Sequence, residues 1–195
     1  FMFNFHFKFK NFYYFKNIDE KWFAGFGGVE KIDALGNKTV LYTHQGNENF
    51  SEKGEENDTP EKRGRVYRIE NYDKNGKLLQ TEIKKWDQVK LPSVIDGKRF
   101  FIKQVQNSRI AYSDAGKDMN AETNEYDDTT SDMLKKTQYG DVVVDEVSGK
   151  ILTDSGDDNL ITETSFAKNT EKNLYGYPVY ETIKDQAGNI LSKKL

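Results

Sequence analysis

The sequence predicts an all-β fold, an extended antiparallel ribbon of β-hairpins with essentially no helix. Residues 64–79 contain two runs of alternating side chains on either side of a turn that ends in Asn75-Gly76, the pattern of a strand, a turn and a strand. Phe (13) and Tyr (11) are plentiful among the 195 residues while aliphatic residues are sparse, as expected of half-buried sheet surfaces. No window keeps apolar residues at helical spacing for more than about two turns.

The turn in residues 64–79 has a chemical basis and a second copy. The Asp73 side chain can accept a hydrogen bond from the backbone two residues on, and Gly76 tolerates positive φ. The spacing recurs in residues 176–191, where Gly176, Asp185 and Gly188 reproduce the offsets of Gly64, Asp73 and Gly76. Two matches at identical spacing indicate a repeat rather than one isolated hairpin.

Residues 1–21 form the first predicted unit, an aromatic-rich N-terminal strand or a fragment end. Phe occupies every second position from Phe1 to Phe9, which places all these rings on one face of a strand. A spacing of two does not fit a membrane-interfacial helix, whose period is 3.6 residues. If exposed, such a strand is an aggregation hazard that Lys8 and Lys10 partly counter.

Residues 22–195 form the second predicted unit, a β-sheet segment built of irregular strand-turn-strand repeats. Its first hairpin is expected from strands 29–33 and 38–44, joined by a turn in which Gly36 follows Asp33 by three residues, as Gly76 follows Asp73.

Residues 45–63 are the longest polar interval of the chain. Loops of this length are functional or mobile, and we expect a solvated excursion from a sheet edge. His44, at its start, is interpreted as an ordinary strand-end histidine. His6 is the only other histidine, and the two lack the spacing of a metal-ligand pair.

The later elements follow the same alternation. We expect strands at 64–72, 77–86, 99–112, 122–127, 134–144, 160–166 and in the second copy of the repeat, a connector at 91–97 with the hairpin signal Asp96-Gly97, and turns at 128–132, 146–150 and 154–159. The acidic interval 114–132 is expected to open with a short loop before its strand.

Charge and composition exclude several classes. The formal net charge is -3 with both signs interspersed, so the sequence lacks the basic patch that is typical of a nucleic-acid-binding protein. Zero cysteines exclude disulfides and thiolate metal sites. No apolar run approaches the ~20 residues of a transmembrane helix, so we expect no membrane span in this segment.

No motif indicates catalysis. Paired carboxylates such as Asp127-Asp128 lie in polar turns, where a solvated face is the default. Residues 154–159 come nearest to a calcium loop, but Gly156 is too early and the closing bidentate Glu is missing. Without cysteine or a close Ser, His and Asp arrangement, no nucleophile is indicated. We therefore expect no enzyme, with no catalytic, metal-binding or cofactor-binding residues and no cofactor.

Aromatic side chains beside polar groups can stack on sugar rings. Trp22, Trp86, Tyr175 and Tyr177 qualify by type and are the candidate glycan-stacking residues. Such residues more often pack on a sheet. A cell-surface carbohydrate-binding module is therefore the alternative function.

The ordered succession of six segments carries a family resemblance. They are residues 22–27 (WFAGFG), 33–38 (DALGNK), 42–47 (YTHQGN), 64–79, 126–130 (YDDTT) and 185–189 (DQAGN). Together they resemble the RHS/YD-repeat superfamily, which includes shell-forming subunits of insecticidal toxin complexes, bacterial RHS polymorphic toxins and teneurins. Two departures are Lys184 in place of the Tyr of Tyr-Asp, and Asp132 where a turn Gly is expected.

The resemblance implies a non-catalytic structural segment of a large secreted or cell-surface bacterial protein. In that family an antiparallel ribbon spirals into a β-shell that encloses or presents a C-terminal toxin or effector. The implied partners are the rest of the shell and an encapsulated effector, with cell-surface glycans under the alternative.

Overall fold

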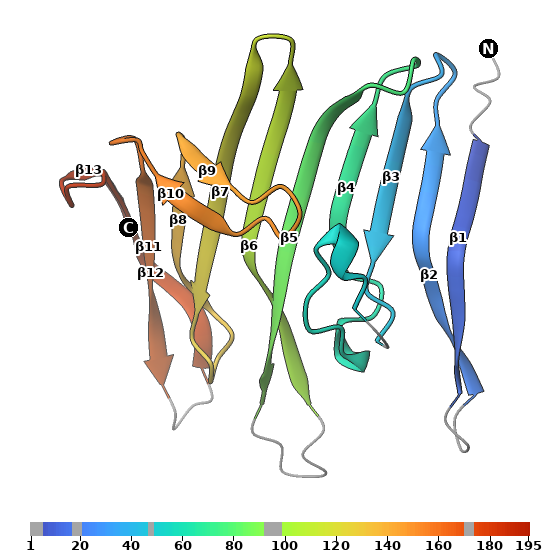
Figure 1. Ribbon diagram of the computed structural model, residues 1–195. Helices are drawn as coiled ribbons and strands as arrows, with labels where there is room; N and C mark the ends of the chain where they lie inside the picture. The colour runs from blue at the N-terminus through green and yellow to red at the C-terminus, as the bar shows by residue number, and fades with distance from the viewer. Residues whose placement is uncertain (1–5, 17–20, 47–48, 92–98, 170–173) are drawn as a thin grey trace.

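The computed structural model describes residues 6–16, 21–46, 49–91, 99–169 and 174–195, with side chains from residue 25 onward except at 174 and 175. Within these ranges the chain forms one 11-stranded antiparallel sheet and one separate hairpin (Figure 1). The sheet contains, in spatial order, β1 (His6–Lys16), β2 (Lys21–Ile32), β3 (Lys38–Thr43), β4 (Val66–Tyr72), β5 (Leu78–Lys90), β6 (Phe100–Ser113), β7 (Gly116–Tyr126), β8 (Met133–Tyr139), β11 (Leu160–Asn169), β12 (Leu174–Lys184) and β13 (Ile190–Lys194).

Almost every strand pairs with the strands that precede and follow it in the sequence, so the sheet is a meander. The exception lies between β8 and β11, where β9 (Val142–Val144) and β10 (Ile151–Asp154) pair only with each other. The helical residues that the structure describes are two short 3₁₀ turns, η1 (Ser51–Lys53) and η2 (Pro60–Lys62), and no helix there is long and apolar enough to cross a membrane. The predicted all-β class is confirmed.

Three hairpin turns share one hydrogen-bond pattern, as the repeat predicts. In each, the Gly N–H donates to the carbonyl of the Asp three residues earlier, at 3.0–3.1 Å. The glycines, Gly36, Gly76 and Gly188, have φ of 88°, 85° and 87°. At the second turn the Asp73 carboxylate also accepts from the backbone of Asn75 and Lys77, each at 2.8 Å. These contacts all lie within five residues of sequence and fix the turn locally.

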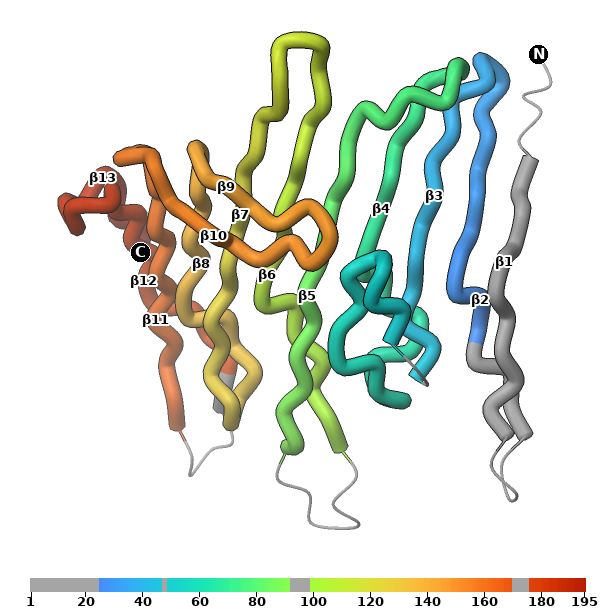
Figure 2. Tube along the Cα trace, in the orientation of Figure 1, coloured from blue at the N-terminus to red at the C-terminus, as the bar shows by residue number. Residues whose placement is uncertain are grey.

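Two segments leave the meander and lie over the same face of the sheet. One is the β3–β4 loop (residues 44–65, of which 47 and 48 lie outside the described part), and the other is the β9–β10 hairpin (Figure 2). They meet at Gly54, where an added Cβ would lie 1.8 Å from the Val147 carbonyl oxygen. An apolar cluster joins the hairpin to the sheet: Val142 and Val144 of β9 pack with Ile110 of β6 and Ala121 of β7.

Three sequence expectations need correction. Residues 45–63 are not a solvated excursion, because Glu55 and Lys62 are buried against the sheet. The predicted strand 134–144 is divided at Gly140 into β8 and β9. Gly140 lies so close to the Asp158 carboxylate that a Cβ there would be 1.8 Å from Oδ2. The strand after Asp114 begins at Gly116, so only a two-residue turn remains of the expected loop.

Other expectations fall partly outside the described residues. The segment 6–16 is a strand paired with β2, but the placement of its rings is not described. The connector 92–97, with its hairpin signal, also lies outside the described ranges.

Candidate functional site

The candidate site centres on His44, the first residue after β3. Its backbone N–H donates to the Arg65 carbonyl and its carbonyl accepts from the Gly64 N–H, both at 2.9 Å. These bonds tie the start of the β3–β4 loop to its end, beside the first residues of β4. His44 is 2% exposed, and its ring lies against Tyr67 at a centroid distance of 5.0 Å.

Two carboxylates from the same loop are held next to His44. Glu55 Oε2 accepts the Phe50 N–H at 2.7 Å, which closes the loop around η1. The Asp58 carboxylate accepts the Gly46 N–H at 2.9 Å and the Gln45 N–H at 3.3 Å. Both acids are therefore oriented by backbone donors rather than by flexible side chains, which fixes their positions.

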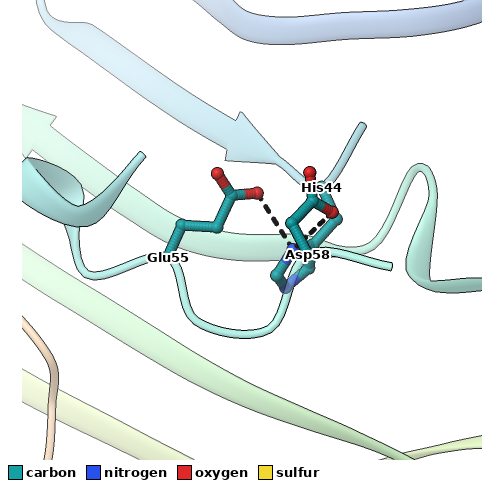
Figure 3. Close-up of side chains that lie close together, drawn as sticks. All are labelled: His44, Glu55 and Asp58. Atoms are coloured by element: carbon teal, nitrogen blue, oxygen red, sulfur yellow. Dashed lines mark hydrogen bonds and ion pairs between the residues drawn. The ribbon is translucent and has the colours of Figure 1, made fainter. Parts of the chain in front are cut away.

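Both carboxylates contact one imidazole nitrogen (Figure 3). His44 Nδ1 lies 2.9 Å from Glu55 Oε1 and 3.1 Å from Asp58 Oδ1. The side chains of His44, Glu55 and Asp58 are 2%, 5% and 0% exposed. Nδ1 carries at most one hydrogen, so it can donate to one carboxylate only. The contact with Asp58 has hydrogen-bond geometry, whereas Glu55 Oε1 is buried without a hydrogen-bond donor.

The electrostatics of the site follow from this arrangement. Burial lowers the pKa of His44, but the contacts of its ring with Asp58 and Glu55, and then their charges, outweigh it, so the pKa lies above its usual value. Burial, with the Glu55 charge nearby, raises the pKa of the Tyr67 hydroxyl. The site is thus an acidic pocket that favours a positive charge at its centre.

A cavity of about 180 Å³ adjoins the site. His44 and Tyr67 form part of its lining, together with Trp86 and Lys84 from β5 and with Val105 from β6. The side chains of Glu55 and Asp58 do not line this cavity, so the imidazole and the two carboxylates form a candidate cation site beside it.

A second polar cluster fixes the adjoining strands. Glu70 on β4 is buried, and its carboxylate accepts four side-chain donors: Tyr72 at 2.7 Å, Arg68 at 2.7 Å, Tyr42 at 3.1 Å and Lys53 at 3.1 Å. Lys53 belongs to η1, and Arg68 also donates to the carbonyl of Val147 in the β9–β10 hairpin. Glu70 therefore links both covering segments to the sheet.

Neither cluster is evident from the sequence, which indicates an ordinary strand-end residue at His44 and predicts no metal-binding residues. The missed signal is the location of His44 immediately before an acid-rich loop, because a loop that folds back brings its carboxylates to the residue at its base. Sequence spacing alone does not show that Glu55 and Asp58 return to His44.

Of the four candidate glycan-stacking residues, the structure describes the side chains of Trp86 and Tyr177, and these two lie far apart in the sheet. Trp86 on β5 is half-buried, donates its indole N–H to the Val66 carbonyl at 2.8 Å and has the Arg65 guanidinium 5.3 Å from its ring. Tyr177, 60% exposed, lies on β12, and four strands separate β5 from β12 in the sheet. The side chains of Trp22 and Tyr175 lie outside those that the structure describes. Trp86 packs on the fold, which is the more common role of such residues.

Comparison with known proteins gives a fold but no sequence relative. No protein-family model matches the chain, and no curated protein matches it. Two solved structures are similar, the crystal structures of TcdB2-TccC3 and of TcdB2-TccC3-Cdc42, with TM-scores of 0.60 and 0.59. Each is 14% identical in sequence, and the match covers 94% of this chain but only 12% of the other. The chain thus shares the fold of a small part of these much longer chains.

Proposed function

We propose that this chain is a structural wall segment of an RHS-type β-shell within a larger exported protein. The observation that carries the proposal is the match of nearly the whole meander to 12% of the TcdB2-TccC3 chain. A wall that extends strand by strand satisfies its backbone groups by pairing each strand with the next, as this sheet does from β1 to β8. In this role the shell would enclose or present a C-terminal effector.

The exposed end of the sheet supports a role in a larger assembly. β13 is an edge of the described sheet, and all of its residues are exposed. Ile190 and Leu191 on this strand are 62% and 58% exposed. An exposed apolar edge strand pairs readily with another strand. In a shell wall the neighbouring repeat would cover this edge.

The first test measures self-association of the isolated chain by light scattering. The chain alone is expected to associate through its open edge. Ile190→Lys with Leu191→Lys should reduce the associated fraction, because charges at an edge oppose strand pairing. Leu35→Lys is the matched control, since Leu35 is 77% exposed but lies in the turn between β2 and β3. A monodisperse parent chain with a cooperative melt contradicts the proposal.

The direct test is a cryo-electron-microscopy structure of the full-length protein in which this chain occurs. The expected result is a wall that continues past β13 by strand pairing and surrounds a cavity. A sheet that ends at β13 and encloses nothing would refute the shell role, whatever the outcome at His44.

A further inference from the structure

The cluster of His44, Glu55 and Asp58 leaves one strong acceptor without a donor. Glu55 Oε1 lies 2.9 Å from His44 Nδ1, but only the Asp58 contact of that nitrogen has hydrogen-bond geometry. The Glu55 side chain is 5% exposed, so bulk water does not replace the missing donor. A buried carboxylate oxygen without a donor is costly, and most native proteins satisfy such atoms. This oxygen, which faces His44 Nδ1, is therefore available to a bound ligand.

The charges in the cluster also favour a bound cation. The candidate ligand atoms of His44, Glu55 and Asp58 lie within 4.8 Å of one another. The cluster places two acidic side chains beside one imidazole, and the buried Lys62 ammonium also interacts electrostatically with both acids. Buried charges are retained in proteins when they are paired or bind a metal ion. A divalent cation bound to a neutral imidazole would compensate both carboxylates.

We propose that His44, Glu55 and Asp58 bind a divalent transition-metal ion, with Zn²⁺ as the ion that fits best. One imidazole nitrogen and two carboxylate oxygens are a donor set that Zn²⁺ accepts, whereas Ca²⁺ takes 6–8 oxygen ligands. Tetrahedral Zn²⁺ places its N and O ligands about 3.3 Å apart. The separations of 2.9 and 3.1 Å from Nδ1 are a few tenths of an ångström shorter. A small outward movement of the side chains therefore admits the ion.

The ion would act as a clamp on the β3–β4 loop. His44 precedes the loop, while Glu55 and Asp58 lie between η1 and η2. Binding all three would fasten the middle of the loop to the end of β3, over the sheet. Water would supply a remaining ligand of the ion. No catalytic step is implied, since the clamp explains the arrangement without one.

The test uses the chain without an affinity tag, stripped with EDTA and titrated with Zn²⁺ by calorimetry. One Zn²⁺ per chain is expected, with affinity at least 10-fold weaker for Glu55→Gln and for His44→Gln, since loss of even an outer-shell partner costs about 10- to 100-fold. Glu52→Gln is the matched control, because Glu52 is an exposed acid of the same loop outside the cluster. Zn²⁺ at about 100 times its Kd should raise the Tm of the parent chain by about 5–10 °C.

A spectroscopic measurement keeps the proposal testable if the variants unfold. X-ray absorption at the zinc edge of the parent chain should show one imidazole nitrogen and at least two oxygen ligands. The His6→Gln variant, which leaves His44 as the only histidine, should give the same spectrum. The proposal is overturned by substoichiometric binding, by a spectrum without imidazole, by unchanged affinity in a folded His44→Gln variant, or by tighter binding of Ca²⁺ than of Zn²⁺. Any of these would leave a cluster held by hydrogen bonds alone.

Discussion

Replacing Glu70 with glutamine should remove the strongest single electrostatic contribution of the described sheet. The substitution keeps the size of the side chain but removes its charge. In the parent chain the Glu70 carboxylate accepts hydrogen bonds from four side chains, those of Tyr42, Lys53, Arg68 and Tyr72. Arg68 is also buried, so Glu70→Gln leaves a buried guanidinium without its counter-charge. Breaking a buried pair in this way is far more costly than losing an exposed one.

The magnitude follows from the pKa of the carboxyl. Burial raises the pKa of Glu70, but the hydrogen bonds from Tyr72, Arg68 and Lys53 outweigh it and lower the pKa from 4.5 to about 2. At ~1.4 kcal/mol for each pKa unit, the ionised carboxylate contributes about 3 kcal/mol to the free energy of unfolding near neutral pH. We therefore expect Glu70→Gln to lower the Tm by roughly 6–12 °C.

The contribution of Glu70 to stability should depend on pH in one direction. The pKa of Glu70 is lower in the folded chain than in the unfolded chain, so its contribution is fully present above pH 4.5. The contribution is lost as the pH falls from 4.5 toward 2. The difference in unfolding free energy between parent and Glu70→Gln should therefore be largest at pH 6–7 and shrink to near zero at about pH 2.

Urea denaturation followed by far-ultraviolet circular dichroism measures this difference, at two protein concentrations to separate association from folding. Glu163→Gln is the matched control, because Glu163 on β11 pairs with Lys184 at 2.6 Å but is 43% exposed. An exposed pair contributes about 0.2–1 kcal/mol. The reasoning is refuted if the two variants lose equal stability, or if the Glu70→Gln difference is independent of pH.

Two glycine predictions use the same urea assay. Gly54→Ala should lower the free energy of unfolding by about 1–3 kcal/mol more than Gly64→Ala. Both glycines have positive φ (+78° and +75°), but only a methyl group at position 54 would collide with Val147. Equal losses would mean that the loop does not pack on the β9–β10 hairpin. Gly76→Val should lower the free energy of unfolding by about 1 kcal/mol or more, because a β-branched residue is strained at positive φ. Gly76→Asn should retain most of the stability. Equal losses would contradict the role of Gly76 in supplying the positive φ of the turn.

The hairpin turns could be predicted from sequence because their determinants are local. The Asp73 side chain binds the backbone two and four residues on, and Gly76 supplies the positive φ in the same turn. A pattern with such short reach is visible in a single sequence. The antiparallel meander then follows, because consecutive strands joined by tight turns pair with each other.

The covering segments could not be predicted, because their determinants are distant in sequence. Residues 45–63 are polar, and polarity in a loop normally indicates solvent exposure. Here Glu55 is buried because it lies against His44, eleven positions earlier, and Gly54 is needed because Val147 lies against it. The division of β8 from β9 likewise involves Asp158, which approaches Gly140 from the turn between β10 and β11.

The same contacts indicate where the sheet is rigid. The described chain buries more polar or charged side chains than hydrophobic ones, so packing on a large apolar core cannot fix the geometry of the sheet. Hydrogen-bonded charges such as Glu70 and Arg68 fix the geometry between the sheet and its two covering segments. Such networks define one arrangement only while the hydrogen bonds of all members are satisfied. β13 has no covering segment and exposes Ile190 and Leu191. A fall in pH that protonates Glu70 should therefore loosen the centre of the sheet. Loss of a strand paired with β13 should instead affect that edge.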